Sequence, residues 1–465
     1  MKSLLLLWVG CSAVGTLGTI PVSDTPTGLT TDGDTDQVTD PPIDPPVPTD
    51  PPDPTDSTTG DTDPPEPTDP TEPTDPPTVP TETGEPEDTA CPPPPVVVPD
   101  VDRVVDCNGG GDFLTIGEAI AASTSGDVIG LAPCTYNERV DYIGKSLDIV
   151  GMTGLAADVV IDGGGAGSVV TAAGGESYGT RIAWVTLTGG DDDAGAAVWV
   201  TEATLDMQGV VVTGNGPSAT MVGVIAGRLR LLDSVVDGNA VTAGGQALEA
   251  TAGSFHVRNS LVDCDGGGQG IEQHNVTLLV DSTVTCAGTA AVLIDGGEIH
   301  AVRSELHGGD VGLNALDNAD EYNERSYLRN SVFSGTEQGA LLQFMHAEIL
   351  NSTFIGERNG LEYDGLRSDS WIANSAFLGG PCDLLGDGDE YLLEFNGFDN
   401  ENDCDVVGAT YTVLGEPLFI ASPLDVQLEK GSPYIDAGDS DRDHDDRDGS
   451  QNDIGRWGGP LAREP

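Results

Sequence analysis

The stretch Ile349-Leu350-Asn351-Ser352-Thr353-Phe354-Ile355 decides the fold, because a small polar pair interrupts a run of apolar residues in it. Apolar and polar positions alternate with a period of two on both sides of the pair, which indicates a β-strand on each side. Equivalent pairs recur at spacings of 26, 22, 22, 27, 21 and 23 residues, at Asp233-Ser234, Asn259-Ser260, Asp281-Ser282, Arg303-Ser304, Asn330-Ser331, Asn351-Ser352 and Asn374-Ser375. Such a period is typical of short units that stack to complete a common core.

Two other repeat folds do not fit this pattern. Leucine-rich repeats have a similar period but need a fixed leucine spacing that is missing here, and propeller blades need about 40 residues per unit. The sequence therefore predicts an all-β right-handed parallel β-helix over residues 101–435. Each polar pair is expected at a bend, where stacked Asn or Ser side chains form hydrogen bonds along the column.

The cysteine spacing supports the same prediction. Cys264 and Cys286 are 22 residues apart, as are Cys382 and Cys404, and 27 residues separate Cys107 from Cys134. One coil per repeat would place each pair on adjacent coils, about 4.8 Å apart, which is close to the Cα separation of a disulfide. We expect these three disulfides, and Cys91 is then left free, capped or paired with another molecule.

Charge excludes several function classes. The 465 residues include 78 Asp+Glu against 18 Lys+Arg, giving a formal net charge of −60. A nucleic acid or a bare anionic lipid surface would be repelled by this excess of negative charge. No stretch of 18 or more apolar residues follows the N-terminus, so the sequence predicts no internal membrane span.

A spacer separates the N-terminus from the repeats. Residues 22–100 hold 20 acidic residues, and residues 21–100 hold 24 of the 32 prolines. This Pro/Thr/Asp-rich segment lacks the apolar surface that folding requires, so we expect residues 21–100 to form a disordered, extended linker.

The first residues predict export. Residues 1–20 have one early positive charge at Lys2, an apolar run from Leu4 to Val9 and then Gly10-Cys11, as a signal peptide does. The segment resembles a bacterial lipoprotein signal, which implies acylation of Cys11, although Trp8 replaces the usual leucine. The alternative is ordinary cleavage near residues 15–19. The protein would be a lipoprotein of the outer membrane or cell surface, or it would be secreted, and only a lipid anchor would attach it to a membrane.

Three further stretches resemble proteins of the pectin-lyase-like superfamily. The entry segment Asp112–Ile120, followed by Gly126–Glu138, resembles the start of that fold, where a short helix, here about residues 115–122, caps the barrel. Residues 187–198 resemble repeats of bacterial surface β-helix proteins, including the polymorphic outer-membrane type. Residues 431–438 and 448–455 resemble the C-terminal close of secreted members. The resemblance spans about residues 104–459 and implies the fold, which hosts lyases, hydrolases, esterases and adhesins.

The catalytic signatures of that superfamily are missing. Tyr136-Asn137-Glu138 resembles the first signature of pectin methylesterases, with Cys134 in place of its glycine. The later blocks that supply the esterase aspartates and arginine are absent. The polygalacturonase blocks are absent as well, and no arginine on a strand is flanked by a clear acidic calcium site.

A different site is predicted on the strand that opens each coil. Alternation points Leu248, Ile271, Val292, Leu313 and Leu361 inward and the residues between them outward. This register stacks Glu249 on Glu272 and places His274 beside Asp295. Such a group can share a proton, hold a metal or, with carboxylates about 5 Å apart, act as a retaining glycosidase. The alternative is a solvated strand face of an acidic protein. Trp184 and Trp199 offer stacking surfaces for sugars, or they fill the core or the surface.

The C-terminal closing segment, residues 436–465, contains a second candidate site. Alternating aspartates can converge on Ca²⁺, which prefers six to eight oxygen ligands. The predicted ligands are Asp439, Asp441, Asp443, Asp445 and Asp448. The run is not an EF-hand, since Asp446 replaces the glycine and Asn452 the glutamate of that motif. The alternative is a solvated acidic loop in which His444 forms salt bridges.

Three functions follow from this organisation. A surface-tethered binding or adhesion protein, a monomer that recognises an extracellular glycan or a surface protein, accounts for the signal, the spacer and the repeats together. A carbohydrate-active enzyme that uses the outward strand face is the first alternative, and a purely structural surface component is the second. The acidic charge favours neutral or cationic ligands, unless Ca²⁺ bridges to an acidic glycan.

Overall fold

The computed structural model describes residues 100–316, 325–367, 369–386, 392–399, 410–421, 425–442 and 444–462. The chain divides into two units, Met1–Pro95 and Val96–Pro465, and the description below concerns the second. The predicted signal peptide, the predicted spacer up to residue 99, Cys11 and Cys91 lie outside the described residues.

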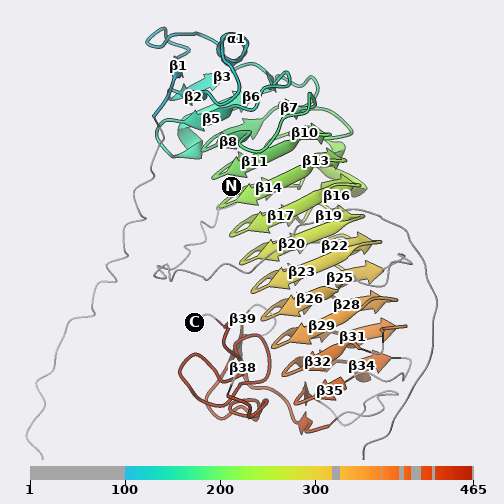
Figure 1. Ribbon diagram of the computed structural model, residues 1–465. Helices are drawn as coiled ribbons and strands as arrows, with labels where there is room; N and C mark the ends of the chain where they lie inside the picture. Colours follow the sequence, from blue (N-terminus) through green and yellow to red (C-terminus); the bar gives the residue numbers. More distant parts are fainter. Residues whose placement is uncertain are drawn as a thin grey trace, which may run out of the picture. The chain divides into compact units, whose positions relative to one another are not determined.

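Three long parallel sheets make up this unit, and successive strands of each sheet come from successive coils (Figure 1). Sheet A has 13 strands: β1 (Arg103–Val105), β2 (Val128–Leu131), β5 (Asp148–Gly151), β8 (Arg181–Ala183), β11 (Thr204–Gln208), β14 (Arg228–Leu232), β17 (Ser254–Arg258), β20 (Val276–Val280), β23 (Glu298–Val302), β26 (Ser326–Arg329), β29 (Ala347–Leu350), β32 (Trp371–Ala373) and β35 (Leu392–Glu394).

Sheets B and C form the other two sides of the stack. Sheet B has 13 strands: β3 (Cys134–Tyr136), β6 (Val159–Asp162), β9 (Thr186–Thr188), β12 (Val211–Val212), β15 (Val235–Asp237), β18 (Leu261–Cys264), β21 (Thr283–Cys286), β24 (Glu305–His307), β27 (Val332–Ser334), β30 (Thr353–Gly356), β33 (Ala376–Gly379), β36 (Gly397–Phe398) and β37 (Val413–Leu414). Sheet C has 11 strands: β4 (Val140–Asp141), β7 (Val170–Ala172), β10 (Val198–Thr201), β13 (Ser218–Ile225), β16 (Val241–Thr251), β19 (Gln269–Gln273), β22 (Ala290–Asp295), β25 (Val311–Leu316), β28 (Gln338–Gln343), β31 (Asn359–Asp364) and β34 (Cys382–Gly386).

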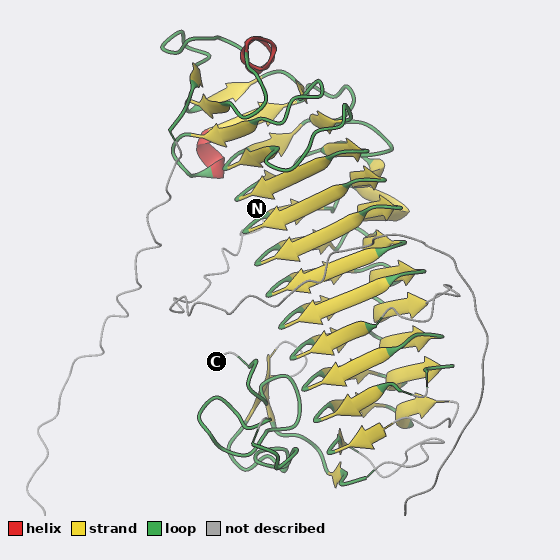
Figure 2. Ribbon diagram, in the orientation of Figure 1, coloured by secondary structure: helices red, strands yellow, loops and turns green. Residues whose placement is uncertain are grey.

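The chain passes from sheet C to sheet A to sheet B in each regular coil and then begins the next coil in sheet C. Strands dominate the unit, and the helix α1 (Ile116–Ala122) and the short η1 (Ala156–Asp158) both lie near its N-terminal end (Figure 2). The prediction of an all-β, right-handed parallel β-helix is confirmed.

The first member of each polar pair turns the chain from sheet A into sheet B. Its φ is 50° at Asp233, 49° at Asn259 and 49° at Asn351. Asn and Asp adopt this left-handed conformation more readily than other non-glycine residues. The predicted position of the pair at a bend is therefore confirmed, with Asn or Asp as the usual turning residue.

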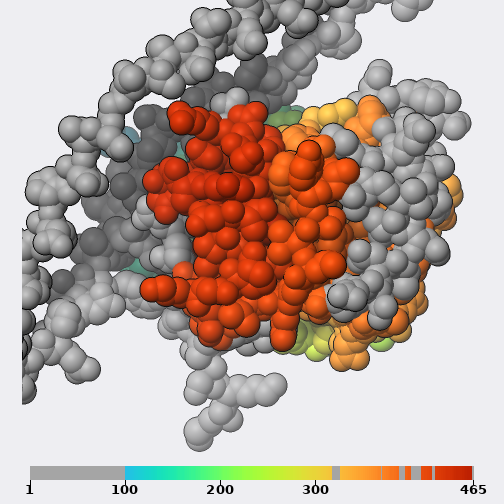
Figure 3. Space-filling model, turned by 90° about the horizontal axis from the view of Figure 1, so that it is seen from below, coloured from blue at the N-terminus to red at the C-terminus, as the bar shows by residue number. Residues whose placement is uncertain are grey.

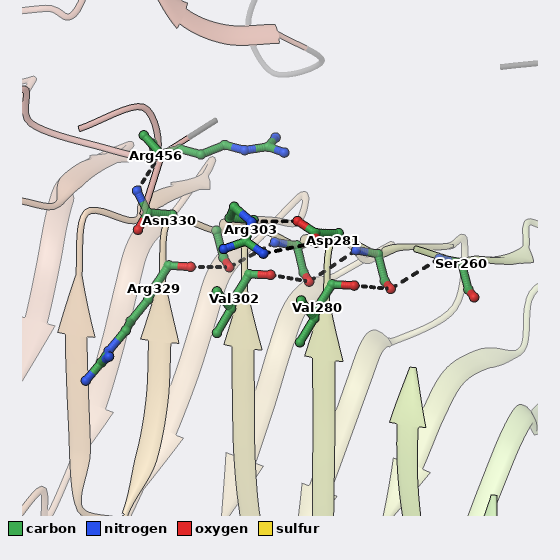
Figure 4. Close-up of polar contacts among 12 residues, drawn as sticks. Ser260, Val280, Asp281, Val302, Arg303, Arg329, Asn330 and Arg456 are labelled. Carbon is green, nitrogen blue, oxygen red and sulfur yellow. Dashed lines mark hydrogen bonds and ion pairs between the residues drawn. The ribbon is translucent and has the colours of Figure 1, made fainter. Parts of the chain in front are cut away.

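The second member of each pair builds a ladder of serines (Figure 4). The Oγ of Ser304 accepts a hydrogen bond from the backbone N–H of Ser282 at 3.3 Å and donates one to the carbonyl oxygen of Val302 at 3.1 Å. The same hydrogen bond, from a backbone N–H to the serine Oγ of the next coil, is formed by Ser234, Ser260, Ser282, Ser304, Ser331 and Ser352. The N–H of Ser375 donates instead to Oδ1 of Asn396. The ladder satisfies buried N–H groups that the bend removes from the sheets.

Apolar side chains fill the interior of the coil. Along the regular strands of sheet C the inward residues predicted from alternation, including Leu248 and Ile271, are fully buried. In sheet B four phenylalanines from successive coils, Phe333, Phe354, Phe377 and Phe398, stack with centroid separations of 4.8, 5.2 and 5.6 Å. The stacked rings form the core of the C-terminal coils.

The N-terminal end of the core is closed by helix α1, which buries Ile116, Ala119 and Ile120. Thr115 caps the helix, because its side chain accepts a hydrogen bond from the N–H of Glu118. The predicted capping helix over about residues 115–122 is thus present.

Two of the three predicted disulfides join described residues. Cys107 pairs with Cys134 at a Cα separation of 6.4 Å, and Cys264 pairs with Cys286 on the adjacent coil at 4.5 Å. Cys404, the predicted partner of Cys382, lies outside the described residues.

After the antiparallel pair β38 (Phe419–Ala421) and β39 (Asp425–Leu428), the chain folds back along the stack. We name residues 431–442 and 444–462 the return segment. It lies against the C-terminal coils (Figure 3) and contacts three bend asparagines. Asn330 donates to the carbonyls of Arg456 and Gly458, Asn351 donates to the Asn452 side chain, and Asn374 accepts from the N–H of Asp439. Serines therefore form the ladder, while these three asparagines hold the return segment.

None of the helices in the described part of the chain is long and apolar enough to cross a membrane.

Candidate functional site

The outward face of sheet C carries the predicted acidic site. The strand register aligns Trp199 of β10 with Gly223 of β13, Gly223 with Glu249 of β16, and Glu249 with Glu272 of β19. The stacking of the two glutamates, which a slip of one residue would have turned inward, is as predicted. Four successive coils thus place an aromatic ring and two carboxylates in one row.

The indole of Trp199 lies over the backbone of Gly223. A Cβ atom on Gly223 would lie 2.9 Å from the ring carbons Cε3 and Cζ3 of Trp199. The missing side chain therefore makes room both for the ring and for the carbonyl oxygen of Ala194, which would lie 2.0 Å from that Cβ atom. Trp199 is half-buried, so part of the indole remains exposed to solvent.

Hydrogen bonds orient both carboxylates. Glu249 Oε2 accepts from the hydroxyl of Thr220, and Glu272 Oε2 accepts from Gln246 Nε2 at 2.6 Å. Both donors lie on sheet C, one coil before the carboxylate that they hold. The carboxylates are therefore positioned by the sheet itself.

His274 lies beside Asp295, where the register predicted it, and it also contacts Glu272. Its Nε2 lies 3.6 Å from Glu272 Oε1, and its Nδ1 lies 3.7 Å from Asp295 Oδ2 and 3.0 Å from the Asp295 carbonyl oxygen. All four predicted residues, Glu249, Glu272, His274 and Asp295, thus lie on three adjacent coils. This arrangement can accept hydrogen bonds from hydroxyl groups and can exchange a proton between an imidazole and a carboxylate.

The acidic run of the return segment is organised by local contacts. Asp439 Oδ2 lies 2.7 Å from His444 Nδ1, Asp439 Oδ1 accepts from the Asp441 N–H, and Asp448 Oδ1 accepts from the Ser450 N–H. Asp443 lies outside the described residues, and within the part of the chain that is described no three His, Cys, Asp or Glu side chains form a group that would hold a metal ion. Calcium binding by Asp439, Asp441, Asp443, Asp445 and Asp448 stays a prediction.

A half-buried ion pair that the sequence analysis did not find joins the return segment to sheet B. Arg456 Nη1 donates to Glu305 Oε1, and His307 Nε2 lies 3.5 Å from Glu305 Oε2. Burial opposes ionisation of Glu305, but the hydrogen bond from His307 and the charge of Arg456 outweigh it and lower the pKa of Glu305 to about 2. The two partners are 151 residues apart, and no local pattern in the sequence connects them.

The depressed pKa of Glu305 predicts a pH-dependent stability. Because the folded pKa of about 2 lies below the ordinary glutamate pKa of 4.5, the stabilisation is complete above pH 4.5 and is lost as the pH falls toward 2. The full effect is on the order of 3 kcal/mol. Urea unfolding of the wild type and of Glu305→Gln should differ most near pH 6 and converge near pH 2. A difference that does not change with pH would contradict this assignment.

Comparisons with known proteins add a likeness in fold. Neither the family models nor the curated protein sequences match the chain. The A-module of the mannuronan C-5 epimerase AlgE6 of Azotobacter vinelandii is similar at 13% identity and a TM-score of 0.42, over 64% of this chain and 91% of that one. Pectate lyase Pel9A is similar at 12% identity and a TM-score of 0.35, over 78% and 97%. The pectin methylesterase of Aspergillus niger is similar at 14% identity and a TM-score of 0.29, over 68% and 91%.

The identification depends on the coil itself, in which three parallel sheets receive one strand each per turn. The chain is a right-handed parallel β-helix built from three parallel sheets.

Proposed function

We propose that this protein is exported and binds a neutral glycan along the outward face of sheet C. The observation that carries the proposal is the row formed by Trp199, Gly223, Glu249 and Glu272 on four successive coils. The part of the Trp199 indole that is open to solvent can support an apolar sugar face, while oriented carboxylates accept hydrogen bonds from sugar hydroxyls. The net charge of −60 favours a neutral polymer over an acidic one.

Export is supported by the signal-like N-terminus and by the two disulfides, because disulfides persist in oxidising compartments. Acylation of Cys11 and an extended spacer would hold the β-helix away from a membrane surface. We infer on this basis a surface-displayed binding protein, whose ligand is a polysaccharide of the cell's surroundings or of another surface.

The test is direct binding. The full chain would be titrated by calorimetry with soluble neutral polysaccharides, namely a mixed-linkage β-glucan, a xylan and a galactomannan. We expect one of them to bind, and Trp199→Ala to weaken that binding about tenfold or more, since the stacking surface is removed.

Two controls separate the site from the fold. Tyr178→Ala removes an exposed aromatic ring from the loop between β7 and β8 and should leave the affinity unchanged. Thermal unfolding of Trp199→Ala should resemble that of the wild type. Equal binding by Trp199→Ala and the wild type, or binding of none of the polymers, would disprove the proposal.

Glycoside hydrolysis is the second candidate, and the position of His274 between Glu272 and Asp295 favours it. Carboxylates on adjacent strands lie at about the 5 Å separation of a retaining glycosidase. Release of reducing ends from the bound polymer that disappears in Glu272→Gln, while binding persists, would make the protein an enzyme.

A further inference from the structure

Sheet B presents a serine, a histidine and a glutamate in contact on its outward face. Ser334 Oγ lies 2.7 Å from His307 Nδ1, and His307 Nε2 lies 3.5 Å from Glu305 Oε2. The register sets these positions, because His307 of β24 pairs with Ser334 of β27 and Glu305 lies two residues before His307 on the same face. A nucleophile within hydrogen-bond reach of a base, with the base oriented by an acid, is the arrangement that activates a serine.

Arg456 holds the acid of this group in place. Its guanidinium pairs with Glu305 Oε1, so that Oε2 is left to face His307. The carboxylate in turn favours the tautomer with a proton on Nε2, which leaves Nδ1 as the acceptor for the Ser334 hydroxyl. Arg456 is therefore a positioning residue that acts through Glu305.

The outward row of sheet B residues that contains His307 and Ser334 changes from polar to apolar after Ser334. Asp263 and Thr285 precede His307 in register on the two earlier coils, and Ile355 follows Ser334 on the next. Ser334 is 9% exposed and Ile355 is half-buried. A molecule attacked at Ser334 would place an apolar group over Ile355 and a hydroxyl-rich group toward Thr285.

We propose that Ser334 is the nucleophile of a second site, which hydrolyses short-chain carboxylic esters of a polyol or sugar. Ser334 Oγ bonds to the carbonyl carbon of the ester, and its proton passes to His307 Nδ1. The C–O bond to the alcohol then breaks, and the alcohol leaves with that proton. Water attacks the acyl-serine by the same route, which releases the carboxylic acid and restores Ser334. The site lies on a different sheet from the proposed glycan surface and does not depend on it.

The test uses a fluorophosphonate, which modifies activated serines, and p-nitrophenyl acetate. The full chain would be incubated with the fluorophosphonate, and the modified residue would be located by mass spectrometry of peptides. We expect modification at Ser334 and none in Ser334→Ala. In His307→Gln both labelling and acetate release should fall by about 100-fold or more, since the general base is lost.

His300→Gln is the matched control. His300 lies 2.8 Å from Glu298 in the same two-residue arrangement on sheet A, and its register partner is Tyr327 rather than a serine. This variant should label and hydrolyse like the wild type. A folded wild type that is not labelled at Ser334, or labelling that is equal in His307→Gln and the wild type, overturns the proposal. Because labelling of Ser334 is measured on the wild-type chain, its absence would decide against the proposal even if a variant failed to fold.

Discussion

Phe354→Ala is expected to lower the free energy of unfolding by about 3–5 kcal/mol, the range for removing a fully buried aromatic ring. Phe354 is the second of the four stacked rings of sheet B, and it contacts one ring on each side, at 4.8 Å and 5.2 Å between centroids. Its loss leaves a cavity between two coils that the serine ladder holds at a fixed distance. The surrounding structure therefore has little freedom to collapse into the space.

Urea unfolding followed by circular dichroism measures this effect. Phe344→Ala is the matched control, because the same change is made at a side chain that is 52% exposed. That control should change the free energy of unfolding by less than about 1 kcal/mol. Similar losses in the two variants would mean that the stacked rings do not carry the core of the C-terminal coils.

Ser304→Ala is expected to destabilise the fold by about 1–3 kcal/mol, because a buried N–H group is left without a partner. Ser304 is fully buried, and its hydroxyl is the acceptor for the Ser282 N–H. The loss of packing from one oxygen atom would be too small to account for such a change. Amide hydrogen exchange at Ser282 should accelerate as well, since that N–H loses its protection.

Ser254→Ala makes the same change at the outward start of β17, outside the ladder. Its effect on stability should stay within about 0.5 kcal/mol. If Ser304→Ala were as mild as Ser254→Ala, and the Ser282 amide kept its exchange rate, the ladder would not contribute to stability.

The fold, the bend and the stacking of Glu249 on Glu272 could all be predicted because they depend on local periodicity. A period of two fixes which side chains face inward, and the recurrence of the polar pair fixes which residues meet on adjacent coils. The same spacing predicted that Cys264 would meet Cys286. In each case a residue contacts the position one repeat away, and that relation is visible in a linear sequence.

The contacts of the return segment could not be predicted in this way. Asn330 donates to the carbonyl of Arg456, 126 residues later, and no repeat spacing relates the two. The group at Ser334 was missed for a different reason. His307 and Ser334 are 27 residues apart, which is one coil, but histidine and serine at outward positions of an acidic repeat protein do not stand out until the register is known.

The return segment also bears on how the length of this protein can change. Its contacts described above begin at Glu305 and continue toward the last coils, and they anchor the segment to bends that include Asn330, Asn351 and Asn374. Duplication or deletion of a whole coil before β23 would preserve every one of these contacts, since the anchored coils would move as a block. The same event between Asn330 and Asn374 would separate the anchors from one another. The fold should therefore tolerate insertion or deletion of whole coils before β23. It should not tolerate such changes among the coils that the return segment contacts.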